Sequence, residues 1–196
     1  MQIGVVICRL MVALVLAIGY TGSALAVDAT GRKFDDTAIV AGQQLQLNGM
    51  GARVKLFIRL YDAALYLKEK HSVPADVLLE PGAKRVAMIM ARDFSSDTFA
   101  QAFIDGIKKN SDLNERGRYI AQMLNFGLYF GTVAQLKQGD VLTVDWIPGI
   151  GTVISINGKR IGEAIPDEGF YRALLKIWLG NNPVDAGLKS AMLRQG

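Results

Sequence analysis

The apolar residues of this chain repeat with two different periods, and the order in which these periods occur limits the folds that it can adopt. Strand-like segments come first, then two helical segments, then strands again, and finally two more helices. The expected strands are 44–49, 53–67 (one strand or a bent pair), 84–92, 140–147, 151–157 and 159–165. Elements grouped in this way predict an α+β fold with helices packed on one side of a large, mostly antiparallel sheet.

The helices are predicted from apolar residues that recur every three to four positions. The first begins at Ser95 or Ser96 and buries a stripe made of Phe99, Phe103 and Ile107. The others are expected over 114–138, 167–179 and 184–193, with a short helical turn at 76–79. Because the second half of segment 114–138 is apolar nearly all round, we expect that helix to be buried on more than one side.

The first 26 residues have the features of a secretory signal peptide. The apolar run from Leu10 to Ile18 is followed by small and polar residues that end in Ala24-Leu25-Ala26, an Ala-x-Ala cleavage pattern. The alternative is a single membrane anchor, but the apolar run is too short to span a bilayer comfortably. We therefore expect cleavage before Val27, one mature domain over 27–196 without a membrane span, and a periplasmic or secreted location.

The composition excludes several classes of function. With 22 basic and 18 acidic residues the net charge is only +4, and no basic stripe of the kind that nucleic-acid binding requires is present. One cysteine and one histidine nearly exclude a zinc site, an iron–sulfur cluster and a Ser-His-Asp enzyme, so we expect no metal and no cofactor. His71 lies in a polar segment and is expected at the surface. No oligomeric state is indicated.

One segment combines charged side chains with strong hydrophobicity. Arg53, Arg59 and Tyr61 lie in the mostly apolar stretch 53–67. An unpaired guanidinium is costly to bury, and an apolar site with a few converging polar groups is the usual arrangement for binding a small ligand. Arginine donates two parallel hydrogen bonds to a carboxylate, and a tyrosine hydroxyl adds a third donor. The alternative is that the arginines pair with acidic residues or extend into solvent.

The same segment resembles the bacterial chalcone isomerase-like proteins. Gly49-Met-Gly-Ala-Arg53 resembles the Gly-x-Gly-x-Arg turn of that family, and segment 57–67 (FIRLYDAALYL) resembles the strand that follows it. Segment 84–93 is similar to the next strand of the family, and segment 170–183 is similar to its closing helix and turn. The resemblance covers nearly all of residues 27–196. It implies an open-faced β-sandwich, in which helices lie against one large antiparallel sheet.

The resemblance implies one of two functions. Plant chalcone isomerases close a flavanone ring, whereas the fatty-acid-binding members grip a carboxylate with an arginine and a tyrosine in the same cleft. Arg53 matches the arginine common to both groups, and Tyr61 matches the fatty-acid binders, since the plant enzymes have threonine there. Segment 95–106 also lacks the tyrosine, lysine and asparagine of the plant enzymes. We therefore expect a protein without catalytic residues that binds a fatty acid or a similar amphipathic carboxylate in a cleft between sheet and helices. The alternative is an intramolecular lyase of the chalcone isomerase type.

Spacing along the chain leaves open which arginine joins Tyr61. Arg53 and Tyr61 are eight residues apart, which is about 26 Å along a straight strand, so a bend or bulge must bring them together. Arg59 is two residues from Tyr61, on the same face of a straight strand and roughly 6.6 Å away. On geometric grounds Arg59 is therefore the alternative partner.

Overall fold

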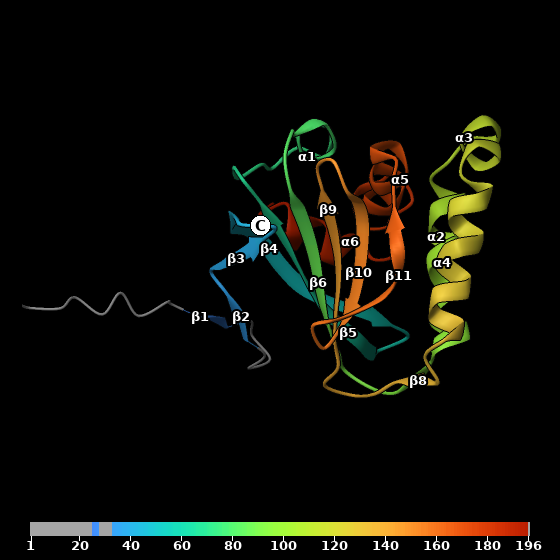
Figure 1. Cartoon of the computed structure of the whole chain (residues 1–196). Coiled ribbons are helices and arrows are strands. Elements are labelled where there is room, and N and C mark those ends of the chain that lie inside the picture. The colour runs from blue at the N-terminus through green and yellow to red at the C-terminus, as the bar shows by residue number, and fades with distance from the viewer. Residues whose placement is uncertain (1–24, 28–32, 196) are drawn as a thin grey trace, which may run out of the picture.

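A seven-stranded antiparallel sheet forms the centre of the protein in a computed structural model that describes residues 25–27 and 33–195. The strand order is β11-β10-β9-β6-β5-β4-β3, as can be followed in Figure 1. These strands are β3 (Thr37–Val40), β4 (Gln43–Lys55), β5 (Ile58–Leu67), β6 (Lys84–Met90), β9 (Val141–Ile147), β10 (Gly151–Ile156) and β11 (Lys159–Ile165). Two small sheets accompany it, β1 (Leu25–Val27) with β2 (Lys33–Asp35), and β7 (Phe94–Ser95) with β8 (Gln135–Leu136).

Helices pack against one face of the sheet, so the predicted α+β architecture is confirmed (Figure 1). They are α1 (Pro74–Leu79), α2 (Ser96–Lys109), α3 (Leu113–Arg118), α4 (Ile120–Gly131), α5 (Glu168–Leu179) and α6 (Ala186–Met192). The hydroxyl of Ser95 accepts a hydrogen bond from the Thr98 amide and begins α2, as predicted. Asp167 caps α5 in the same way through the amides of Gly169 and Phe170.

The two faces of the sheet are buried by different partners. On β5, Tyr61, Ala63 and Leu65 belong to the large core cluster that also contains the inward residues of α2, α4, α5 and α6. The alternate residues Ala64 and Tyr66 belong to a second, smaller cluster with Phe34, Val40, Leu45, Leu47, Ala83 and Ala87. This alternation is the ordinary consequence of the two-residue period of a strand. It determines which side chains of β5 face the helices.

The segment predicted as one helix over 114–138 is instead two helices followed by a strand. The backbone leaves helical geometry at Tyr119, whose ring is buried edge-on against Phe170 at 5.9 Å between centroids. The expectation that α4 is buried on more than one side is wrong. Its buried residues are Met123, Phe126 and Phe130, while the other side exposes three large apolar residues to solvent, which are Ile120, Leu124 and Leu128. High hydrophobicity all round did not bring a second packing partner to this helix.

The strand predicted at 44–49 does not turn at Gly49, and the motif from Gly49 to Arg53 lies inside β4 rather than in a turn. Glycine is needed at position 49 because α6 passes directly over it. A Cβ atom there would come within 2.2 Å of the Ala191 carbonyl oxygen. The actual turn is at Leu56 and Phe57, so segment 53–67 consists of the end of β4 and all of β5.

The predicted signal peptide lies outside the described residues, except for Leu25 and Ala26. These two residues belong to β1, which pairs with β2 apart from the main sheet. Cleavage before Val27 therefore stays a prediction. Among the described residues, no helix combines the length and the hydrophobicity needed to cross a bilayer.

Candidate ligand-binding site

The β4–β5 hairpin brings Arg53 and Tyr61 directly opposite each other. They are paired residues in the register of the two strands, which the two-residue turn at Leu56 and Phe57 reverses. The distance of about 26 Å applies only to one straight strand, and the hairpin provides the bend that the pairing of Arg53 with Tyr61 requires. The reversal of the chain is a tight hairpin, and it places both side chains that the resemblance singled out at one position of the sheet.

Two donors at this position have no acceptor among the described residues. The Tyr61 hydroxyl oxygen accepts a hydrogen bond from the Trp178 indole at 3.0 Å and from Arg53 Nη1 at 3.5 Å. Both partners are donors, so the hydroxyl hydrogen of Tyr61 is not used in these bonds. The buried Nε of Arg53 also has no hydrogen-bond partner. Buried donors normally have acceptors, so the pair is suited to an oxygen-rich ligand.

The surroundings of Tyr61 keep its phenol neutral. Tyr61 is only 1% exposed, and this burial raises its pKa above the usual 10.0, although the nearby Arg53 charge opposes the rise. The guanidinium carbon of Arg53 lies 5.5 Å from the centre of the Tyr61 ring, a cation–π distance. Arg53 supplies a positive charge and Tyr61 supplies a neutral donor, which together match a carboxylate.

Arg59, the alternative partner, does not lie beside Tyr61. A bulge in β5 leaves Leu60 without a partner on β4, since Arg53 pairs with Tyr61 and Val54 pairs with Arg59. Leu60 packs against the helix-side core, whereas Arg59 forms an ion pair with the buried carboxylate of Asp62. The expectation that Arg59 shares a face with Tyr61 is wrong because the bulge breaks the two-residue alternation. Arg59 instead pairs with an acidic residue, which was the alternative to ligand binding for the arginines of this segment.

The side chains next to the Arg53–Tyr61 pair are aromatic. Trp178 of α5 contacts Tyr61 and meets Phe103 of α2 edge-on, with 5.4 Å between ring centroids. Phe103 stacks on Phe126, and both belong to a group of contacting rings from the helices α2 and α4 that also contains Phe99 and Phe130. The role of Trp178 could not be predicted, because its period along α5 marks it only as a buried residue.

Of the cavities in the described part of the chain, one lies beside this layer and another lies on the opposite face of the sheet. A groove of about 440 Å³ between α2 and α4 is lined by residues that include Ile104, Met123 and Leu124, with Lys108 and Arg116 as its charged members. On the opposite face of the sheet, a hollow of about 630 Å³ is lined by residues that include Phe34, Tyr66, Arg85, Ile89 and Thr143. The first groove adjoins the aromatic layer through Met123, which belongs to the same core cluster.

The polar side chains of the second hollow are already paired. Arg85 and Asp145 lie opposite each other on β6 and β9 and form a two-pronged ion pair, with distances of 2.7 and 2.6 Å. The Tyr66 hydroxyl donates to the carbonyl of Asp35 at 2.9 Å. The hollow therefore offers a ligand fewer unused donors than the Arg53–Tyr61 pair does.

Comparison with known proteins identifies the fold and the family. Thirty-eight chains of solved structures match the protein. One is the crystal structure of the Arabidopsis thaliana fatty-acid binding protein AtFAP1, which superposes with a TM-score of 0.67 at 14% sequence identity, over 87% of this chain and 96% of that one. At this identity the likeness shows a shared fold. A search of curated proteins gives no match in sequence. The chalcone isomerase-like family model, however, matches residues 26–194, and the chain therefore belongs to the chalcone isomerase-like family.

Proposed function

We propose that this protein binds a fatty acid or a similar amphipathic carboxylate without transforming it. The observation that carries the proposal is the pair of neighbouring donors, Arg53 Nε and the Tyr61 hydroxyl, that have no acceptor among the described residues. A carboxylate supplies two acceptor oxygens and the negative charge that Arg53 favours. The fold is shared with a protein named as a fatty-acid binder, which supports the same ligand class.

The apolar part of the ligand would lie in the aromatic layer between the sheet and the helices α2 and α4. Phe103 and Phe126 occupy that layer in this structure, so the chain of the ligand needs side chains to move apart. We propose that α4 supplies this movement, because one side of it has no packing partner among the described residues. The groove between α2 and α4 already separates part of their surfaces.

Binding of laurate or palmitate to substituted proteins tests the carboxylate site. Arg53→Ala removes a charge-assisted hydrogen bond, which contributes about 1.5–3 kcal/mol, so affinity should fall roughly 10- to 100-fold. Tyr61→Phe removes one neutral hydrogen bond of about 1 kcal/mol and should cost several-fold only. Arg53→Lys should recover part of the loss, because it keeps the charge but not the planar fork.

Arg118→Ala is the matched control for these substitutions. Arg118 is an exposed arginine at the end of α3, so its removal changes the net charge equally but leaves the site intact. Affinities are measured by calorimetry on variants whose circular dichroism matches that of the wild type. If Arg53→Ala binds laurate as tightly as Arg118→Ala does, the carboxylate is not held where we propose. If Arg59→Ala alone weakens binding, Arg59 rather than Arg53 holds it.

The inner face of α2 supports the non-catalytic reading. Its buried side chains are Phe99, Ala100, Phe103 and Ile107, together with Ser96 at its first turn. No tyrosine, lysine or asparagine of α2 faces the sheet to position a phenolate. Purified protein should therefore not accelerate chalcone cyclisation over the spontaneous rate. A turnover number near the enzyme median of about 10 per second would overturn this reading in favour of the lyase.

We also propose that the protein is exported, with cleavage before Val27. The Ala24-Leu25-Ala26 pattern supports this, and the family match begins at residue 26, next to the expected cleavage point. Cleavage there would remove two of the three residues of β1, which lies outside the main sheet. Intact mass spectrometry of protein from the periplasmic fraction is the test, and a chain that still begins at Met1 would contradict the proposal.

A further inference from the structure

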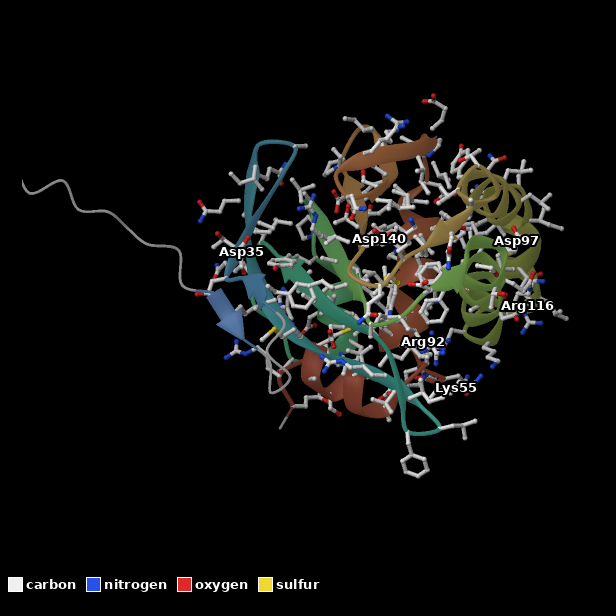
Figure 2. The ribbon with its side chains drawn as sticks, turned by 90° about the horizontal axis from the view of Figure 1, so that it is seen from below. Asp35, Lys55, Arg92, Asp97, Arg116 and Asp140 are labelled. Carbon is white, nitrogen blue, oxygen red and sulfur yellow. The ribbon has the colours of Figure 1, made fainter. Side chains whose placement is uncertain are left out.

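The end of the β4–β5 hairpin exposes a group of large apolar side chains that the carboxylate site does not use. Leu56 is 80% exposed, Phe57 is fully exposed, and the flanking Val54 and Ile58 are each nearly half exposed. Figure 2 shows the hairpin projecting from the rest of the ribbon, with Lys55 labelled at its end. These four apolar residues, which we call the hairpin tip, add little to the core of the protein.

The backbone of the hairpin tip makes these side chains still less expected. Leu56 and Phe57 have φ angles of +50° and +64°, which a two-residue type I′ turn requires at both central positions. Asn-Gly is the favoured pair for such a turn, and this protein has it in the β10–β11 hairpin, where Asn157 and Gly158 also have positive φ. Bulky apolar residues at a strained and exposed turn point to a role outside the fold.

Positive charge surrounds the hairpin tip. Lys55 is exposed between Val54 and Leu56, and Arg53 precedes Val54 on β4. Arg92 is exposed on the neighbouring chain segment, where the preceding amide, that of Ala91, donates to the carbonyl of Leu60. Figure 2 shows Lys55 and Arg92 labelled on the same side of the molecule.

The acidic groups nearest to the hairpin tip are already engaged. Asp62 pairs with Arg59, as described above. Asp185 accepts hydrogen bonds from the amides of Val54 and Leu188, and Asp93 accepts from the amide of Gln138. Amide donors leave the charges of Asp185 and Asp93 in place, but the three basic residues Arg53, Lys55 and Arg92 outnumber these two acids, so the hairpin presents an apolar end with a cationic collar.

We propose that the hairpin tip inserts into the surface of an anionic lipid bilayer. Apolar side chains that enter the boundary between headgroups and acyl chains, with basic residues at the phosphates, are the usual features of a surface-binding segment. A protein partner is less well matched, since a stable interface uses about 20–30 residues on each side and the hairpin tip offers a narrow protrusion. Docking in this way places Arg53 and Tyr61, which are three and four residues from the turn, next to the membrane surface.

The α4 helix is the competing surface, and it provides a matched control. Ile120, Leu124 and Leu128 form an exposed stripe of similar hydrophobicity on α4. They lie in regular helical geometry, so no backbone strain accompanies their exposure. A variant that removes two leucines from this stripe therefore changes the exposed apolar surface without changing the hairpin tip.

Co-sedimentation with vesicles of phosphatidylcholine and phosphatidylglycerol in a roughly 2:1 ratio tests the proposal. Leu56→Asn/Phe57→Gly removes two apolar side chains and puts the favoured pair into the turn, so this variant should fold at least as well as the wild type. We expect it to bind the vesicles at least about tenfold more weakly than the wild type. The control Leu124→Gln/Leu128→Gln should bind within about twofold of the wild type. All variants share one N-terminus, so any contribution from residues 1–26 cancels.

A second pair of measurements tests the cationic collar. Lys55→Glu/Arg92→Glu should weaken binding to the anionic vesicles at least about tenfold and leave any binding to pure phosphatidylcholine unchanged. The proposal is overturned if the wild type does not bind anionic vesicles, if the turn variant binds them like the wild type, or if the loss is confined to the α4 variant. The readout uses no fatty acid, so it is independent of the proposed carboxylate site.

Discussion

At the scale of single residues, the two arginines Arg53 and Arg59 are only six positions apart but have different partners. Arg59 has a buried carboxylate, Asp62, within ion-pair distance, and its charge is largely neutralised there. Arg53 has no carboxylate within that distance among the described residues, and it contacts the Tyr61 hydroxyl and ring instead. A ligand carboxylate competes with an existing ion pair at Arg59 but not at Arg53. This difference is the reason why the proposed site uses Arg53.

The β4–β5 turn makes a prediction about stability. A left-handed conformation costs an ordinary residue roughly 1–2 kcal/mol, and Asn-Gly relieves most of that cost. Leu56→Asn/Phe57→Gly should therefore raise the free energy of unfolding by about 1–3 kcal/mol. Urea unfolding at an unchanged m-value measures this.

The β10–β11 turn supplies the opposite control. Gly158 has a φ of +76°, and nothing lies within 4 Å of the position that an added Cβ would take. Gly158→Ala should therefore destabilise the protein through its backbone alone, by about 1 kcal/mol. If the Leu56/Phe57 variant were less stable than the wild type, the two side chains would have packing partners that the structure does not show.

At the scale of elements, the contact of α6 with β4 depends on two glycines. A Cβ atom at Gly49 would meet the carbonyl oxygen of Ala191 at 2.2 Å, and one at Gly51 would meet the Ala191 Cβ at 2.8 Å. Neither atom can rotate away, because the position of an alanine Cβ is fixed by the backbone, and the shorter distance makes Gly49 the more restricted of the two. The buried Asn48 strengthens the same contact, because its amide nitrogen donates to the carbonyl of Met192 at 2.7 Å.

Gly49→Ala should push α6 away from β4. Overpacking of this kind typically costs about 1–3 kcal/mol of stability, and the loss is measured by thermal or urea unfolding. Gly117→Ala on α3 is the control, because nothing lies within 4 Å of a Cβ at that position. There alanine should be neutral or stabilising by roughly 0.5–1 kcal/mol, since it favours the helix. Equal effects of the two substitutions would contradict the close approach of α6.

The contact between β6 and α5 contains a buried cation. Lys84 is fully buried, and its Nζ lies 3.7 Å from Glu168, which is longer than a hydrogen bond. Burial lowers the pKa of Lys84 below its usual 10.5, although Glu168 opposes the change. The folded state therefore disfavours the ammonium form, and Lys84→Met should stabilise the protein at pH 7 by about 1–2 kcal/mol.

The pH dependence of the stabilisation by Lys84→Met tests this prediction. A lowered folded-state pKa means that the stability penalty is absent above the unfolded pKa, near 10.5, and develops as the pH falls below it. The difference in unfolding free energy between Lys84→Met and the wild type should thus shrink as the pH rises toward 10.5. A difference that is constant with pH would mean that Lys84 titrates normally in the folded protein.

At the scale of the whole molecule, both faces of the sheet bury tyrosines. Tyr61 and Tyr171 lie in the helix-side core, and Tyr66 lies in the smaller cluster on the other face. Burial raises the pKa of Tyr66 to about 12, that of Tyr171 well above 10.0, and that of Tyr61 above the same value. The folded state therefore disfavours loss of the phenolic protons of these three tyrosines.

Stability should accordingly fall in alkaline solution. Because the unfolded chain releases these protons near pH 10 and the folded chain does so only later, the stability is complete below about pH 10 and is lost as the pH rises toward 12. Urea unfolding at pH 8 and pH 11 measures the loss. Tyr66→Phe should show a smaller difference between the two pH values than the wild type, and an equal difference would contradict the raised pKa of Tyr66.

What the sequence by itself determined about this protein is mostly local. The cap at Ser95, the strand at 84–92 and the Asn157-Gly158 hairpin all follow from residues close together in the chain, because periodicity, capping and turn preferences act over a few positions. The resemblance of the motifs to the chalcone isomerase-like proteins also identified the family correctly.

Only the tertiary structure decided how the candidate site is assembled. Leu56 and Phe57 carry no signal for a tight turn, since such residues disfavour positive φ, so the position of the turn between Arg53 and Tyr61 could not be predicted, although a bent pair of strands was one alternative. The bulge that turns Arg59 away, and the Trp178 indole that reaches Tyr61 from 117 positions along the chain, depend on packing between distant elements. Local patterns describe a residue's own neighbours, whereas which faces meet is set by the folded core as a whole.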